Sequence, residues 1–148
     1  MVDILVSLSR SRNMAKIKSK DTKPEMIIRK YLHAKGLRYR IHDKQLPGKP
    51  DIVLPRFKTV IFVHGCFWHR HEKCRLAYTP KTHCDFWNKK FEANVKRDRF
   101  VIATLIEKGW RIIIVWECAI RSKSRDEYLM QTYNEIFSDQ QITHIQDM

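Results

Sequence analysis

The segment 50–66, PDIVLPRFKTVIFVHGC, contains two runs, 51–54 and 59–63, that are apolar after their first residue and are typical of buried β-strands. The residues between the two runs include a proline and a lysine and predict the turn of a hairpin. The second run leads directly into polar side chains at His64 and Cys66. The segment therefore predicts a hairpin whose second strand ends at a chemically active loop.

A single α/β domain over residues 1–148 is expected from the elements around this hairpin, because helices and strands alternate along the chain. The strand expected over 111–116 is apolar on both faces, which indicates a central position in the sheet. The other expected elements are a basic N-terminal arm over 1–20, a helix from 21–25 to Gly36, a strand over 37–41, a long helix over 85–108 and a C-terminal helix within 122–148, most clearly over 124–137.

The chain is strongly basic, with 29 Lys and Arg against 16 Asp and Glu and a formal net charge of +13. This excess predicts a polyanionic partner and favours nucleic acid, because the interleaved tryptophans and phenylalanines offer faces on which bases can stack. No apolar run approaches the roughly 18 residues of a membrane helix. Residues 1–8 do not resemble a signal peptide. We therefore expect a cytoplasmic protein without a membrane segment.

Cysteine and histidine spacing predicts a metal site in the loop after the hairpin. Cys66, His71 and Cys74 are spaced closely enough for one loop to wrap one ion. Structural zinc takes four Cys or His ligands in a tetrahedron. Cys84 and Cys118 are the candidates for the fourth ligand, and Cys118 is favoured because it directly follows the central strand. The alternative is a set of ordinary buried thiols, since four cysteines in a reducing compartment need not form disulfides.

Carboxylates and histidines near the hairpin are candidates for catalysis. Asp51 opens a strand, where an aspartate can hold Mg²⁺ against a phosphate, and hairpin pairing can bring it close to the loop. His64 and His69 are candidate general bases because imidazole titrates near neutral pH. Asp98 could orient such a histidine or form an ion pair within its helix. Glu25 could join the site or interact only with its helix dipole.

Five motifs together resemble the very-short-patch-repair (Vsr) mismatch endonucleases over about residues 10 to 121. The motifs that carry this resemblance occupy residues 11–14, 46–51, 60–69, 94–99 and 109–119. The resemblance implies a variant of the PD-(D/E)xK restriction-endonuclease-like fold, with a mixed central sheet flanked by helices. It also implies a Mg²⁺-dependent hydrolase that nicks double-stranded DNA 5′ to the thymine of a T:G mismatch, the product of 5-methylcytosine deamination.

The resemblance further implies roles for individual residues near the scissile phosphate. Asp51 and the backbone carbonyl of Val63 would bind magnesium. His69 would be the general base, with Asp98 as its partner. Two further residues, His64 and Glu25, would support the active site.

DNA contacts and a zinc site are also implied by the resemblance. Phe67, Trp68 and Trp87 would enter the base stack from the major groove, and Met14 from the minor groove. Lys90 and Asn94 match positions near the mismatched bases. The zinc ligands would be Cys66, His71, Cys74 and Cys118.

The chain departs from the nuclease superfamily at its second usual motif, an acid followed by a lysine two residues on. Val63 and Gly65 occupy that stretch, so phosphate oxygens and water would complete the magnesium shell. The interval from His71 to Cys74 is one residue longer than in the most familiar form of the family. We expect a monomer with a functional link to a cytosine-5 methyltransferase and to mismatch-repair proteins. A sequence-specific restriction endonuclease of the same fold and a non-catalytic zinc-stabilised nucleic-acid-binding module are the alternatives.

Overall fold

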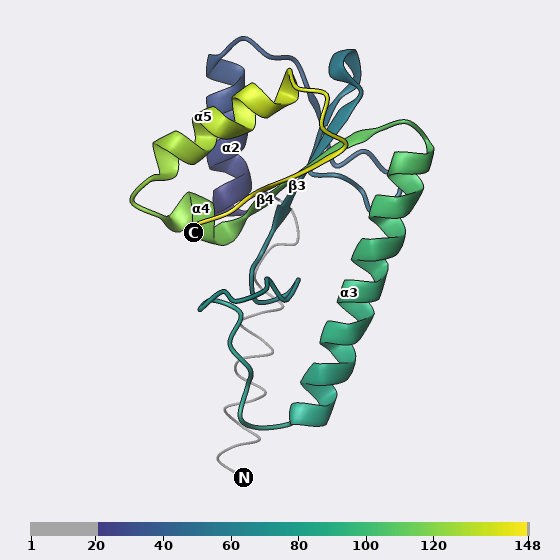
Figure 1. The fold of residues 1–148 in the computed structure, drawn as a ribbon, viewed down its shortest axis with the longest axis vertical. Helices are drawn as coiled ribbons and strands as arrows, with labels where there is room; N and C mark the ends of the chain where they lie inside the picture. Colours follow the sequence, from purple (N-terminus) through teal and green to yellow (C-terminus); the bar gives the residue numbers. More distant parts are fainter. Residues whose placement is uncertain (1–20, 148) are drawn as a thin grey trace.

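The computed structural model describes residues 21–147 (Figure 1). The basic arm over 1–20, including Met14, therefore lies outside the described residues, as does Met148. Among the described residues, no helix is both long and apolar enough to cross a membrane.

Five strands within the described range form one mixed sheet in the order β1-β2-β3-β4-β5. β2 pairs antiparallel with β1 and β3, whereas β4 and β5 continue the sheet in parallel. The expected hairpin is confirmed: Ile52 lies opposite Ile61, and the turn between β2 and β3 is a short 3₁₀ helix, η1. The bounds are β1 Arg40–Ile41, β2 Ile52–Leu54, η1 Pro55–Phe57, β3 Thr59–His64, β4 Arg111–Trp116 and β5 Ile142–Ile145.

Helices cover both faces of this sheet. Figure 1 shows α2, α4 and α5 on one side of the strands and the long helix α3 on the other. Thr22 caps α2 by accepting a hydrogen bond from the backbone N–H of Glu25, and Pro24 occupies the first turn. Their bounds are α2 Lys23–Ala34, α3 Cys84–Glu107, α4 Glu117–Arg121 and α5 Arg125–Ile136.

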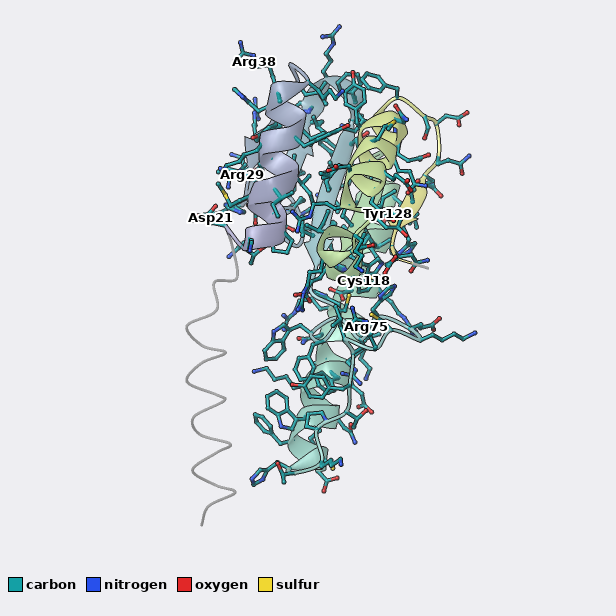
Figure 2. All side chains as sticks on the ribbon, turned by 90° about the vertical axis from the view of Figure 1, so that its left-hand side faces the viewer. Asp21, Arg29, Arg38, Arg75, Cys118 and Tyr128 are labelled. Atoms are coloured by element: carbon teal, nitrogen blue, oxygen red, sulfur yellow. The ribbon has the colours of Figure 1, made fainter. Side chains whose placement is uncertain are left out.

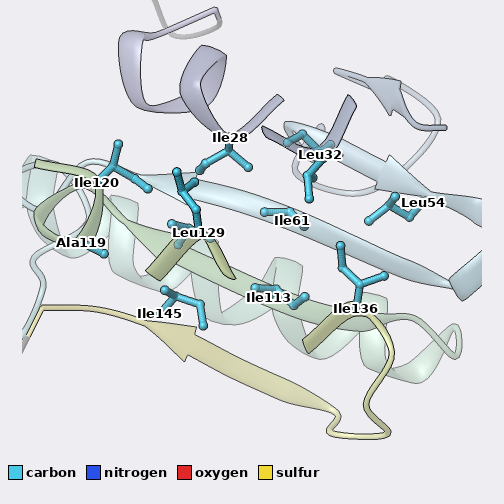
Figure 3. Packing of buried hydrophobic residues seen from close by; sticks show 12 residues of the cluster. Ile28, Leu32, Leu54, Ile61, Ile113, Ala119, Ile120, Leu129, Ile136 and Ile145 are labelled. Atoms are coloured by element: carbon cyan, nitrogen blue, oxygen red, sulfur yellow. The ribbon is translucent and has the colours of Figure 1, made fainter. Parts of the chain in front are cut away.

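Two apolar clusters, one on each face, hold the layers together. On the face covered by α2 and α5, Ile61 and Ile113 pack with Ile28, Leu129 and Ile136, all buried (Figure 3). The opposite face packs against α3 through buried residues that include Val60, Ile112, Ile114, Val101 and Leu105. Because β4 contributes to both clusters, its expected central position is confirmed.

The expected C-terminal helix over 122–148 is wrong in its extent. α5 ends at Ile136, and β5 adds a fifth strand beside β4. β5 has only four residues, of which Ile145 alone is buried, so it lacks the apolar run that marks a strand in sequence. The strand expected over 37–41 is reduced to β1, and α4 is an additional short helix directly after β4.

The ends of β3 and β4 lie together at one edge of the sheet, where His64 pairs in register with Trp116. The loop 65–83 leaves from β3 at this edge and returns to α3. Gly48, in the loop before β2, has a φ of +75° and lies so close to α3 that an added Cβ would come within 2.5 Å of Val101. The fold thereby brings the β1–β2 loop, the end of β3 and the middle of α3 around one space.

Candidate functional site

The carboxylate of Asp51 is fixed at the start of β2. Its Oδ2 accepts a hydrogen bond of 2.7 Å from the backbone N–H of Val63 in the neighbouring strand. Burial raises the pKa of the Asp51 carboxyl to about 7, and the nearby charge of Glu25 adds to the rise, whereas the Val63 N–H opposes it. A nearby cation favours the ionised form of a carboxyl group, so a cation bound beside Asp51 would displace this proton.

Glu25 is the second acid of this region, with only 1% of its surface exposed. Its Oε1 accepts from the backbone N–H of Asp21 at 3.1 Å, and its Oε2 lies 3.2 Å from Arg29 Nη1 and 2.9 Å from His42 Nε2. Figure 2 shows Asp21 and Arg29 along the first turns of α2. Glu25 is therefore more than a helix-dipole partner: it is a buried acid with partners from two elements.

Sequence reasoning missed Arg29 and His42. The only signal for Arg29 was its position one helical turn after Glu25. His42 gave no signal, because it reaches the site through tertiary structure: its backbone N–H donates to the carbonyl of Asp51 at 3.3 Å. His42 thus contacts both acids: its backbone N–H contacts Asp51, and its ring contacts Glu25.

His64, His69 and Asp98 form a second group beside Asp51. The two imidazoles are stacked with centroids 3.8 Å apart, and His69 Nδ1 lies 2.6 Å from Asp98 Oδ2. Because an ionised carboxylate only accepts, Nδ1–H donates to Asp98 and the lone pair of His69 is on Nε2. Burial lowers the pKa of His64 well below its ordinary value, with His69 and His144 contributing, so His64 is neutral. His64 Nδ1 has no hydrogen-bond partner among the described residues.

These groups share a cleft of about 750 Å³. Asp51, His64, His69 and Asp98 line it, and Lys44, Lys49 and Arg97 add positive charge. A cleft that combines an acid, a base and several cations suits the hydrolysis of a phosphodiester, whose negative charge the cations attract.

The four residues expected to bind zinc lie together at the adjacent corner of the fold. The ligand atoms of Cys66, His71, Cys74 and Cys118 are all within 4.8 Å of one another. Burial raises the pKa of the Cys66 and Cys118 thiols, so a bound cation would be needed to ionise them. Three sulfurs and one imidazole are a donor set that suits zinc. Cys84 is exposed and is not part of this group, which favours Cys118 as the fourth donor.

An aromatic cluster extends from the loop 65–83 onto α3. Phe67 contacts the rings of Trp68, Trp87 and Phe91 at centroid distances of 5.2, 5.9 and 5.2 Å. Phe67 and Trp68 are partly exposed, whereas Trp87 is only 6% exposed. Trp87 therefore supports the other two rings in this structure, and no local pattern in the sequence indicates its burial.

Lys90 and Asn94 hold Trp68 from α3. Lys90 Nζ lies 5.2 Å from the centroid of the Trp68 ring, and Asn94 Nδ2 donates to the Trp68 carbonyl at 3.1 Å. A second cleft, of about 900 Å³, runs along this surface and shares Val63, His64 and His69 with the first. The aromatic rings and the acid–base groups therefore border one continuous surface.

Comparison with known proteins identifies the family. The family model described as DNA mismatch endonuclease Vsr matches residues 2–75. DNA mismatch endonuclease Vsr of Escherichia coli K12 is 44% identical over 137 residues, which cover 91% of this chain and 87% of that protein. The chain belongs to the Vsr family.

Further members of this group are named as nicking enzymes. Type II nicking enzyme V.NmeAIP of Neisseria meningitidis is 47% identical over 84% of this chain and 88% of its own. Type II nicking enzyme V.XorIIP of Xanthomonas oryzae pv. oryzae is 47% identical over 81% of this chain and 88% of its own. The resemblance of the sequence to the Vsr family is thus confirmed over nearly the whole chain.

The structure brings together most of the residues that the Vsr resemblance singled out. They fall into three adjoining groups: the acids Asp51 and Glu25 with Val63, the His64–His69–Asp98 group, and the Cys66–His71–Cys74–Cys118 cluster. Phe67, Trp68, Lys90 and Asn94 form a fourth group on the same surface, and Trp87 lies buried among them.

Proposed function

We propose that this Vsr-family protein is a magnesium-dependent endonuclease that nicks one DNA strand 5′ to the thymine of a T:G mismatch arising from 5-methylcytosine deamination. The observation that carries this proposal is the convergence of Asp51 with the His69–Asp98 pair in one cleft lined by lysines and arginine. The names of the relatives support a nicking endonuclease. The net charge of +13 supports DNA as substrate.

A restriction-endonuclease-like fold and a single domain over 1–148 are part of the proposal. The mixed sheet with helices on both faces supports this fold, and its single run of five strands supports one domain. Nicking of one strand requires one active site, so we propose that the protein acts as a monomer. The repair pathway would link it to a cytosine-5 methyltransferase and to mismatch-repair proteins.

Asp51 and the carbonyl of Val63 suit magnesium, which prefers oxygen ligands. In a strand, the N–H and C=O of one residue point to the same neighbouring strand. Because the Val63 N–H reaches Asp51, the Val63 carbonyl is directed to the same side. Magnesium bound there would polarise the scissile phosphate.

His69 is placed to take a proton from the attacking water. Its Nε2 is available because Nδ1–H donates to Asp98. Asp98 fixes this tautomer and stabilises the positive imidazolium that forms after proton transfer. The ring of neutral His64 stacks on His69 and holds the plane of the His69 ring, while the bond to Asp98 sets its orientation.

Zinc would act as a structural ion that fastens the loop 65–83 to the sheet. Its four proposed ligands come from this loop and from Cys118 in α4, directly after β4. Four protein ligands leave no open coordination position, which excludes a catalytic role for this ion. By fastening this loop, the ion would hold Phe67 and Trp68 next to the acid–base groups.

Phe67 and Trp68 would select the mismatch by entering the base stack. A T:G wobble pair stacks less well than a matched pair, so opening the step costs less free energy. Base–aromatic stacking contributes roughly 1–3 kcal/mol per base and offsets much of that cost.

The function is tested by incubating the full chain and Mg²⁺ with end-labelled duplexes that differ only in one T:G or C:G pair. We expect a single nick 5′ to the thymine and no cut in the matched duplex. Cleavage of both strands of the matched duplex would identify a restriction endonuclease. Binding of both duplexes without any cleavage would identify a non-catalytic binding module.

Trp68→Ala is expected to slow nicking of the T:G duplex by roughly 10- to 100-fold, because it removes about 1–3 kcal/mol of stacking. Phe100→Ala is the matched control: Phe100 is an aromatic residue of α3 that is 69% exposed and takes no part in the aromatic cluster. Single-turnover rates measure both. Equal rates for the two variants would show that Trp68 does not enter the base stack.

A further inference from the structure

The C-terminal strand β5 brings Gln146 to the back of the Cys66–His71–Cys74–Cys118 cluster. Ile145, the last residue of β5, is buried and lies opposite Val115 of β4. The next residue therefore reaches the end of β4, where the amide Oε1 of Gln146 lies 2.5 Å from His71 Nε2. The two residues are 75 positions apart in sequence, so their contact exists only when β5 has joined the sheet.

The two ring nitrogens of His71 face different partners. Nδ1 lies 3.6 Å from the sulfur of Cys118, inside the group of four donors. Nε2 faces the amide oxygen of Gln146 on the other side of the ring. A nitrogen that binds a metal needs a free lone pair, so Nδ1 must be unprotonated and Nε2 must carry the hydrogen. Nε2–H then donates to Gln146, which fixes both the tautomer and the ring orientation.

Neighbouring contacts fix Gln146 in place. The carboxylate of Asp147 accepts from Tyr128 Oη at 2.9 Å and from Ser122 Oγ at 3.4 Å, which ties the end of the chain to α5 and the turn before it. The backbone N–H of Asp147 also donates to the sulfur of Cys118. The segment after β5 therefore contacts two of the four donors directly.

The plane of the His71 ring is restrained independently. Trp116 stacks on it with centroids 4.1 Å apart and an interplanar angle of 11°. The indole N–H of Trp116 in turn donates to His144 of β5 at 3.0 Å. Stacking on Trp116 is compatible with two ring orientations that differ by a 180° flip about the Cβ–Cγ bond, whereas the hydrogen bond from Nε2 to Gln146 forms in only one of them. Gln146 thus supplies the restraint on the orientation of the His71 ring that stacking on Trp116 does not provide.

We infer that Gln146 is a positioning residue for the zinc ligand His71, so that the zinc affinity of the loop 65–83 depends on the C-terminal strand. The inference rests on the zinc site proposed above. Removing such an outer hydrogen bond from a metal-bound histidine costs about 10- to 100-fold in metal affinity. The side chain acts only through His71, because it does not belong to the donor group itself.

The test compares zinc affinities of purified full-length variants by competition with a chromophoric chelator. Gln146→Leu, which removes the acceptor, is expected to bind zinc about 10- to 100-fold more weakly than the wild type. Gln146→Glu keeps an acceptor and is expected to bind zinc at least as tightly as the wild type. Gln140→Leu is the matched control, because Gln140 is exposed and lies just before β5. It should leave the affinity unchanged.

The absorption spectrum of the Co²⁺-substituted protein reports on the ligands around the metal. It would stay unchanged if Gln146 only stabilised the fold. Gln146→Leu should alter the cobalt bands at saturating metal, and Gln146→Glu should keep them. If Gln146→Leu does not fold, Gln146→Asn replaces it, because the shorter side chain withdraws the amide from His71. Wild-type affinity and spectrum in the Leu or Asn variant would overturn the role of Gln146 alone. A wild-type protein that binds no zinc would overturn the zinc site itself.

Discussion

Asp51→Asn is expected to reduce nicking of a T:G duplex by at least about 10³-fold, since a bound metal stabilises the transition state by several kcal/mol. The amide keeps an oxygen for the Val63 N–H but loses the charge that attracts magnesium. Zinc content should stay unchanged, because Asp51 is not part of the cysteine–histidine cluster. Single-turnover nicking and metal analysis on the same preparation check both statements. Asp139→Asn, at an exposed position, is the control.

Thermal denaturation at several pH values without magnesium separates loss of catalysis from loss of folding. Burial raises the pKa of Asp51 from 3.8 to about 7, so the folded state favours the protonated form. This group's contribution to stability is fully present below the unfolded pKa and is lost as pH rises through about 7. Asp51→Asn should therefore be at least as stable as the wild type at pH 8. A folded variant that still nicks the T:G duplex would contradict the proposed role, and a variant that is less stable than the wild type at pH 8 would contradict the expected pH dependence.

Cys118→Ser is expected to lose bound zinc and to lower the melting temperature by about 10 °C, because zinc binding contributes directly to folding free energy. Cys84→Ser is its matched control. Cys84 is exposed at the start of α3, and its bonds within residues 21–147 are to carbonyls of its own loop, so both zinc content and melting temperature should stay at wild-type values. Metal analysis after dialysis and differential scanning calorimetry give the two readouts.

The opposite pattern would refute the assignment of the fourth ligand. Zinc retained in Cys118→Ser and lost in Cys84→Ser would make Cys84 the ligand, which would require the start of α3 to move to the cluster. Zinc lost in neither variant would leave three ligands within the loop 65–83 as the whole site.

Local sequence pattern sufficed for the centre of the fold. The hairpin β2–β3 and the strand β4 are continuous apolar runs, and such runs are buried wherever they occur in an α/β domain. Spacing also sufficed to group three of the four clustered donor residues, because Cys66, His71 and Cys74 lie in one loop. The choice of Cys118 over Cys84 depended on its place after a central strand, and the geometry favours the same choice.

Contacts that arise from distant segments left no local pattern. β5 is short and mostly exposed, so its residues resemble a loop until β4 is beside them. His42 and Gln146 reach Glu25 and His71 across 17 and 75 positions. Burial of Trp87 likewise depends on the return of the loop 65–83 onto α3, which no periodicity within α3 specifies.

The wide separation of the proposed zinc donors also has a consequence for the order of folding. Cys66 and Cys118 are 52 positions apart, and both come together only where the parallel strands β3 and β4 end. Parallel pairing is a late, non-local event, because a long chain segment must close before it forms. We therefore expect tight zinc uptake to be a late step, because a chain that has not yet paired β4 with β3 offers only the three proposed donors of the loop 65–83. Refolding followed by zinc binding and by circular dichroism should show metal capture after most secondary structure has formed.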